Sequence, residues 1–148
     1  VIFLEKHPAA AVQLKENLHT LGASNAQVWA GDALLWLTQN PEPFDLVFLD
    51  PPFGKNLLQP ALDSLQLLPG ALIYVEHEAT LKPQFPANWQ ELKCKNTKEF
   101  YFRLFEVEDI EGWIAKANWV LHKRLFLRCY LAPVAEVLKW RKKLLGEK

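Results

Sequence analysis

Apolar residues occur in short runs that alternate with segments of helical periodicity through the first half of the chain. The runs are apolar on both faces, as strands of a buried parallel sheet are. The segments between them carry helix signals, such as Pro8 in a first turn and Asp32 as a cap. The pattern predicts strands at 1–5, 26–30, 45–49 and 71–75, and helices at 8–21, 32–37 and 57–67. This order is typical of a three-layer, doubly wound α/β fold with a mostly parallel sheet and helices on both faces.

The pattern changes after Pro86. Residues 89–95 and 100–107 are two runs rich in aromatic and β-branched or long side chains, and Asn96-Thr97-Lys98 separates them. Short runs joined by polar turn residues favour a β-hairpin. We therefore predict an antiparallel C-terminal hairpin at one edge of the sheet.

The last part of the chain is predicted to be a basic, helical extension. Apolar residues recur at helical spacing from Trp113 to Leu121, and after a break at Pro133 a short helix is predicted to reach Leu145. Residues 113–148 carry nine Lys and Arg against two Glu, whereas the rest of the chain carries eight basic and fifteen acidic residues. We therefore divide the chain into a domain at 1–108 and an extension at 109–148.

Three interpretations of this extension stay open. Its Lys and Arg side chains would follow RNA phosphates while a tryptophan stacks on bases. Alternatively, an amphipathic helix packs its Trp and Leu side on the body of the protein and turns its charges to solvent, which we favour. The third interpretation is a basic helix that lies on a membrane surface.

Composition limits the class of protein. With 148 residues, 50% of them hydrophobic, the chain is long enough for one domain with a core. It has neither an apolar stretch of membrane-spanning length nor a signal-peptide pattern, so we expect a cytoplasmic protein without a membrane partner, and no obligate protein partner is identifiable. Cys94 and Cys129 are too few and too distant for a disulfide framework or a zinc site, and we expect no metal. The chain lacks methionine and opens inside an apolar run, which predicts a fragment without its N-terminal part, or a non-AUG start at Val1.

Three acidic residues follow the first three predicted strands. Glu5 ends the first strand, Asp32 follows the second and Asp50 ends the third. The carboxyl ends of parallel strands share one edge, where open α/β sheets bind their ligands. Glu5 at the end of an early strand suits ribose hydroxyls, and the alternative is a solvated strand end. Asp32 suits an adenine amine, a helix cap, or both.

Asp50-Pro51-Pro52-Phe53 is the most informative of these sites. The two prolines make the loop stiff and remove two N–H donors, which leaves carbonyl oxygens to accept hydrogen bonds. The carboxylate also accepts hydrogen bonds, and the Phe53 ring offers a flat face. These groups together suit a planar base with an exocyclic amine, whereas the alternative is a simple turn that ends a strand.

The ordered set Leu4-Glu5, Gly31-Asp32-Ala33 and Asp50-Pro51-Pro52-Phe53 resembles Rossmann-like, S-adenosylmethionine-dependent methyltransferases that modify exocyclic amines. Residues 71–76 and 86–89 are similar, more narrowly, to the bacterial 16S rRNA guanine-N2 methyltransferase family, and the resemblance covers about residues 1–107. It implies that Glu5 holds the cofactor ribose and that Asp32, with Ala33 beside it, holds the adenine. It also implies 16S rRNA or the small ribosomal subunit as partner.

For the reaction, the resemblance implies that the catalytic residues are Asp50, Pro51, Pro52 and Phe53. Asp50 and the Pro51 carbonyl would accept hydrogen bonds from the guanine amine, and Phe53 would stack on the base. Two acceptors aimed at an aryl amine favour pyramidal geometry and restore its lone pair for attack on the sulfonium methyl. No covalent nucleophile is needed, and the chain has no Pro-Cys pair of the kind used in cytosine-C5 chemistry.

The chain departs from this family in one respect. A strand and a glycine-rich turn that carry the methionine end of the cofactor precede the family's equivalent of Val1, and no G-x-G-x-x-G pattern is present. We therefore expect the sheet to lack its central strand, between the first and third strands, and expect no tight S-adenosylmethionine binding.

Two other functions stay open. One is a DNA adenine-N6 or other amine methyltransferase, and the other is a non-catalytic remnant or RNA-binding module. Glu76-His77-Glu78 follows the fourth strand, and we interpret it as a solvated strand end rather than a part of the site.

Overall fold

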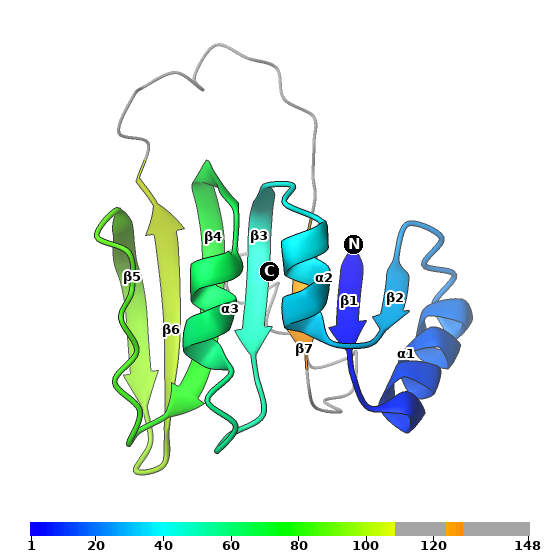
Figure 1. Cartoon of the computed structure of the whole chain (residues 1–148), viewed down its shortest axis with the longest axis horizontal. Coiled ribbons are helices and arrows are strands. Elements are labelled where there is room, and N and C mark those ends of the chain that lie inside the picture. The colour runs from blue at the N-terminus through cyan, green and yellow to red at the C-terminus, as the bar shows by residue number, and fades with distance from the viewer. Residues whose placement is uncertain (109–123, 129–148) are drawn as a thin grey trace, which may run out of the picture.

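The computed structural model describes residues 1–108 and 124–128, which form a seven-stranded sheet of order β2-β1-β7-β3-β4-β6-β5 (Figure 1). Its strands are β1 (Ile2–Glu5), β2 (Gln27–Ala30), β3 (Phe44–Asp50), β4 (Leu67–Glu78), β5 (Trp89–Asn96), β6 (Phe100–Val107) and β7 (Arg124–Arg128). Its helices are α1 (Pro8–Thr20), α2 (Ala33–Gln39) and α3 (Leu58–Ser64). The α/β architecture predicted from the hydrophobic pattern is confirmed.

The boundaries of the parallel part follow local sequence signals. Pro8 occupies the first turn of α1, and Gly22 adopts a φ of +62° just after that helix. Asp32 caps α2 with its side chain. The third helix ends earlier than predicted, at Ser64, because the chain from Leu67 onward already pairs with Phe44 as part of β4. Pro69-Gly70 then shifts the register between β3 and β4.

The hairpin is also confirmed. β5 pairs antiparallel with β6, and β6 pairs antiparallel with β4. β5 is therefore an edge strand, and all of its residues after Trp89 are exposed. The register between β5 and β6 shifts between Glu91 and Lys93, where Leu92 forms a bulge.

β7 corrects two predictions. The extension was expected to be helical, yet residues 124–128 form a strand, and the expected gap in the centre of the sheet is filled by that strand. β7 runs parallel to β1 on one side and to β3 on the other. The apolar run Leu125-Phe126-Leu127 explains this, because consecutive apolar residues are typical of a strand buried on both faces. The helices predicted from Trp113 to Leu121 and up to Leu145 lie outside the described residues.

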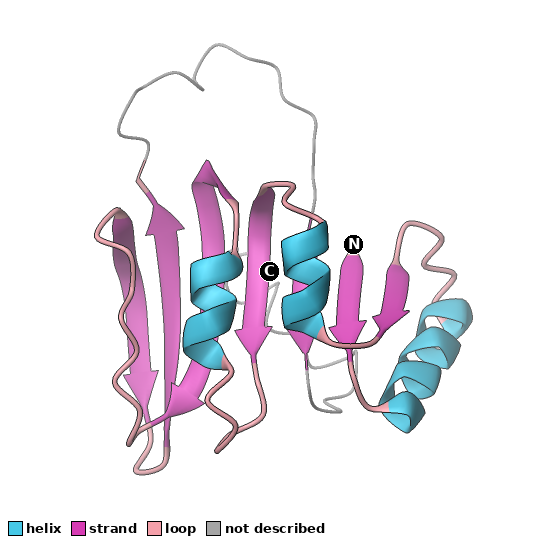
Figure 2. Cartoon of the chain, viewed as in Figure 1, coloured by secondary structure: helices cyan, strands magenta, loops and turns pink. Residues whose placement is uncertain are grey.

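The main core lies between the sheet and two helices. α2 and α3 cover the same face of the sheet, in front of its central strands (Figures 1 and 2). Buried side chains of β3, β4 and β6 meet those of the two helices in one cluster; among them are Leu37, Val47, Leu49, Leu58, Ala61, Leu62, Ile73, Val75 and Phe105. α1 packs near β2, and its buried Ala11 and Leu14 lie outside this cluster. The chain crosses from β1 to β2 in the opposite direction from β2 to β3, so right-handed crossovers put α1 and α2 on opposite faces.

No helix in the described part of the chain is both long and apolar enough to cross a membrane.

Candidate functional site

The predicted acidic residues share one edge of the sheet. β1, β2 and β3 run in the same direction in the sheet and end at Glu5, Ala30 and Asp50, and Asp32 comes just after β2 (Figure 1). Glu5 is only 3% exposed. Its Oε1 accepts a hydrogen bond from the backbone N–H of His7 at 2.6 Å, which fixes the turn from β1 into α1. The alternative interpretation of Glu5 as a solvated strand end is therefore wrong, and the buried carboxylate lies at the sheet edge where open α/β sheets bind their ligands.

Asp32 is the cap of α2. Its Oδ1 accepts hydrogen bonds from the backbone N–H groups of Leu34 and Leu35, at 3.0 and 3.3 Å. Its Oδ2 forms an exposed ion pair with Lys6 at 2.9 Å. The hydrogen bond from Lys6, with help from the helix N–H groups, lowers the pKa of Asp32 below its usual value. Ala33 is the first residue of α2.

Gly31 allows the chain to turn tightly before this cap. A Cβ atom at this position would lie 2.4 Å from the indole of Trp29. The turn between β2 and α2 therefore suits a residue without a side chain, and it places Asp32 beside the end of β1.

The Asp50–Phe53 corner follows β3 directly. Pro51 is buried, and the Phe53 ring is 41% exposed. The Phe53 ring stacks on the ring of Phe100 at the start of β6, with centroids 4.9 Å apart and an interplanar angle of 21°. The backbone N–H of Gly54 donates a hydrogen bond to the carboxylate of Glu78 at the end of β4. The loop is thus held to β4 and β6, which are distant in sequence.

Sequence reasoning missed Tyr74 and Phe100, and it interpreted Glu78 as part of a solvated strand end. The Tyr74 hydroxyl donates a hydrogen bond to Glu76 at 2.9 Å. Burial raises the pKa of Tyr74, and the negative charges of Glu76 and Asp50 raise it further. The alternation of β4 was the available signal, since Tyr74, Glu76 and Glu78 are two residues apart and share a face.

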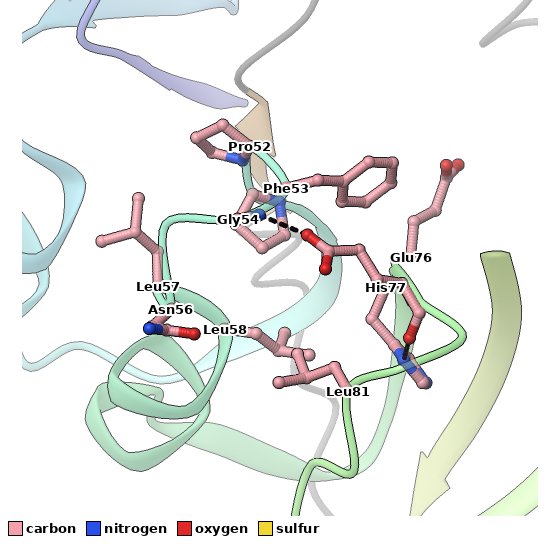
Figure 3. A pocket seen from close by; sticks show the side chains of 11 residues that line it. Pro52, Phe53, Gly54, Asn56, Leu57, Leu58, Glu76, His77 and Leu81 are labelled. Carbon is pink, nitrogen blue, oxygen red and sulfur yellow. Dashed lines mark hydrogen bonds between the residues drawn. The ribbon is translucent and has the colours of Figure 1, made fainter. Parts of the chain in front are cut away.

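A small pocket lies next to the corner (Figure 3). The Phe53 ring lies on the side of Glu76, whereas Leu58 and Leu81 lie together on the opposite side. The cavity volume is about 20 Å³, which is room for one water. A purine ring does not fit this volume, and Asp50 does not line the pocket, so a base does not enter the pocket in this conformation. The lining residues are Pro51, Pro52, Phe53, Gly54, Asn56, Leu57, Leu58, Glu76, His77, Glu78 and Leu81.

His77 corrects a further prediction. Residues 76–78 were expected to form a solvated strand end, yet His77 is 2% exposed and lines the pocket. Its ring stacks on Tyr101 at 5.2 Å, and its Nδ1 lies 2.8 Å from the Glu78 carbonyl oxygen. Nδ1 therefore carries the proton, and Nε2 has no partner among the described residues. Burial lowers the pKa of His77, and the nearby Arg103 lowers it further.

The described residues contain no group of three or more His, Cys, Asp or Glu side chains arranged to hold a metal ion.

Comparison with known proteins identifies the family. The model of the family described as "Conserved hypothetical protein 95" matches residues 1–106. Ribosomal RNA small subunit methyltransferase D of Haemophilus influenzae is 44% identical over 114 residues, which are 72% of this chain and 59% of that protein. The protein of the same name from Escherichia coli K12 is 38% identical over 110 residues, 71% of this chain and 56% of that protein.

Solved structures of putative methyltransferases are also similar to this chain in fold and sequence. A putative methyltransferase, yhhF, from Escherichia coli has a TM-score of 0.67 at 37% identity, over 72% of this chain and 62% of that chain. A putative methylase, HI0767, from Haemophilus influenzae has a TM-score of 0.65 at 40% identity, over 74% of this chain and 73% of that chain. The chain spans less than two thirds of the curated relatives it matches. β7 lies beyond the residues that the family model matches. The chain belongs to the conserved hypothetical protein 95 family, whose curated relatives are small-subunit ribosomal RNA methyltransferases, as the sequence motifs predicted.

Proposed function

We propose that this chain carries the target-base site of an enzyme that transfers a methyl group from S-adenosylmethionine to the exocyclic N2 amine of a guanine in 16S rRNA. The names of the relatives support rRNA methylation. The observation that carries the proposal is the Asp50–Phe53 corner, which places a carboxylate and a ring at the end of β3. The corner lies at the same sheet edge as Glu5 and Asp32.

The residues present fit the nucleoside end of the cofactor. Glu5 is a buried carboxylate at the carboxyl end of β1, suited to ribose hydroxyls. The Oδ2 of Asp32 holds only an exposed Lys6 ammonium, which an adenine amine can replace while Oδ1 continues to cap α2. Ala33, the next residue, adds no polar group beside Asp32. S-adenosylmethionine, when bound, supplies an electrophilic sulfonium methyl.

The role of this chain's own residues is to orient the amine and favour its attack. Asp50 and the Pro51 carbonyl accept hydrogen bonds from the two N–H groups of the amine. These hydrogen bonds restore the nitrogen lone pair and stabilise the positive charge that develops on nitrogen. Asp50 does not have to be a strong base beforehand, because the amine becomes acidic as it is methylated and then gives its excess proton to the Asp50 carboxylate or, through it, to solvent. Phe53 stacks on the guanine once it has left its closed position on Phe100. Pro52 stiffens the loop.

Nucleoside analysis tests this proposal. Because no tight cofactor binding is expected, the full chain is incubated with a saturating concentration of isotope-labelled S-adenosylmethionine and with 16S rRNA, as free RNA and as small subunits. The RNA is then digested to nucleosides for mass spectrometry. We expect the label in N2-methylguanosine. Label in N6-methyladenosine would instead support the alternative amine methyltransferase.

A second candidate function rests on β7. A strand from outside the family match occupies the centre of the sheet, between β1 and β3. This arrangement favours a non-catalytic RNA-binding module if the same assay gives no methyl transfer at saturating cofactor while the chain still binds RNA.

A further inference from the structure

One face of the hairpin end of the sheet has no described helix on it. Val75, opposite Arg103, belongs to the core that α2 and α3 cover. Because side chains alternate along a strand, Phe102 and Leu104 point to the opposite face. Lys95 lies opposite Phe102, and Lys93 lies opposite Leu104, so both lysines share that face. We call this surface the hairpin face; it comprises Lys93, Lys95, Phe100, Phe102 and Leu104.

The hairpin face is continuous with the candidate site. Phe100 is its residue nearest the pocket, and its ring carries the stacked ring of Phe53. Glu76 and Glu78 lie on the same side of β4, opposite Phe102 and Phe100. A base held at Phe53 would therefore have the hairpin face directly beside it.

The positive charges of β5 lie beside the aromatic rings of β6 on this surface. Lys93 and Lys95 are exposed, and Lys98 in the adjoining turn is exposed as well. Phe100 and Phe102 are half-buried, so part of each ring faces outward. The carboxylates nearby have partners or lie at the margin, since Glu76 accepts from Tyr74 and Glu78 accepts from Gly54. Glu99 lies in the turn, and Glu106 lies on this face at the end of β6 far from the pocket.

We infer that the hairpin face binds the single-stranded RNA that flanks the target guanine, with Lys93, Lys95 and Lys98 on the phosphates and Phe102 against a base. This inference rests on the proposed function and adds the route of the substrate strand to it. Sheet faces with aromatic residues and surrounding basic side chains bind single-stranded RNA because bases stack on the rings while the cations follow the backbone. The edge position of β5 leaves room for the strand to leave the protein.

Salt-dependent RNA binding tests the inference on the full chain. The probe is a short, fluorescently labelled, single-stranded RNA oligonucleotide with one guanine, and its anisotropy is measured over a range of salt concentrations. Replacing all three lysines (K93A/K95A/K98A) should lower the slope of log affinity against log salt by about 2, because each phosphate contact to a single strand contributes about 0.7. Lys15→Ala, on α1, is the control and should leave the slope unchanged.

A conservative variant separates stacking from charge. Phe102→Leu keeps an apolar side chain on the face, and it should weaken RNA binding about tenfold or more without changing the salt slope. The unfolding midpoint of every variant is measured alongside, so that loss of fold is recognised.

The outcomes distinguish this inference from the proposed function. If the unaltered chain binds RNA but the triple-lysine variant keeps the slope of the Lys15→Ala control, the hairpin face is not the RNA surface and the inference is overturned. It is also overturned if Phe102→Leu lowers the unfolding midpoint and leaves RNA affinity intact, because Phe102 then supports the fold and does not contact RNA. Methyl transfer to guanine without any RNA binding by the hairpin would leave the proposed function standing.

Discussion

The ring of Phe53, in the loop after β3, stacks on the ring of Phe100 at the start of β6, with 4.9 Å between centroids. This contact joins the candidate base-binding loop to the hairpin. It also holds the loop against β6, and the pocket beside the loop has a volume of only about 20 Å³. In the proposed function, the loop opens before a guanine stacks on Phe53.

Loss of the Phe100 ring should open the loop. An aromatic pair of this kind contributes about 0.5–1.5 kcal/mol, which corresponds to a roughly 2- to 12-fold change in the open population. Phe100→Ala should therefore speed chymotrypsin cleavage at Phe53 by that factor under native conditions. Leu104→Ala, two pairs along the same face, is the control. Equal cleavage rates in the two variants would show that the stack does not hold the loop.

Asp32 should act as a helix cap whether or not it also binds adenine. Asp32→Ala should lower the free energy of unfolding by about 1 kcal/mol, since the N–H groups of Leu34 and Leu35 lose their acceptor. Asp32→Asn should cost less, because its amide oxygen can still accept. Lys6→Ala should cost under about 1 kcal/mol, as exposed ion pairs do. Urea unfolding measures the free energy of unfolding of all three variants. If Asp32→Ala has the same free energy of unfolding as the unaltered chain, the capping role is refuted.

Stability should fall in mild acid because of His77. Its pKa in the folded state lies below the value of 6.5 for an unfolded chain, so the unfolded state binds the proton more readily. The contribution of neutral His77 to the free energy of unfolding is complete above pH 6.5. It is lost as the pH falls toward the pKa of the folded state, at up to about 1.4 kcal/mol per pH unit. His77→Phe should remove this part of the pH dependence, measured as urea midpoints between pH 5 and 8.

The control for His77 is His19→Gln, on the exposed last turn of α1. This variant should keep the pH profile of the unaltered chain. If His77→Phe and His19→Gln have the same profile, the acid sensitivity arises elsewhere.

β7 should be an integral part of the sheet. Phe126 pairs with Phe3 on one side and Phe48 on the other. Phe126→Pro removes its N–H from a central strand and should lower the free energy of unfolding by at least about 1–3 kcal/mol, whereas Phe126→Leu keeps the N–H and should cost much less. Thermal unfolding of both variants measures the difference. Equal midpoints would show that β7 contributes little to the sheet.

The sequence predicts the parallel part of this fold well for a physical reason. Short runs that are apolar on both faces and that alternate with helix signals are typical of buried parallel strands. The acids that follow such strands then share an edge, as Glu5 and Asp50 do. Asp32 as a cap is also local, because the three residues involved are adjacent in sequence.

Features that depend on tertiary pairing could not be predicted in this way. β7 is a short strand with arginine at both ends, and its apolar run is only three residues long and follows a segment of helical spacing. Its pairing with β1 and β3 therefore decides that it is a strand. The stack of Phe53 on Phe100 and the burial of His77 against Tyr101 depend on the register of β4 with β6, which no local pattern encodes.

The role of Asp50 is tested most directly by its amide variant. Asp50→Asn keeps the size of the side chain and removes the charge, while Asp63→Asn, on α3, is the matched control. Transfer of labelled methyl to 16S rRNA is followed as N2-methylguanosine. We expect Asp50→Asn to lower the rate by about 10²-fold or more, with Asp63→Asn unchanged. Equal rates of N2-methylguanosine formation in the two variants would contradict the account.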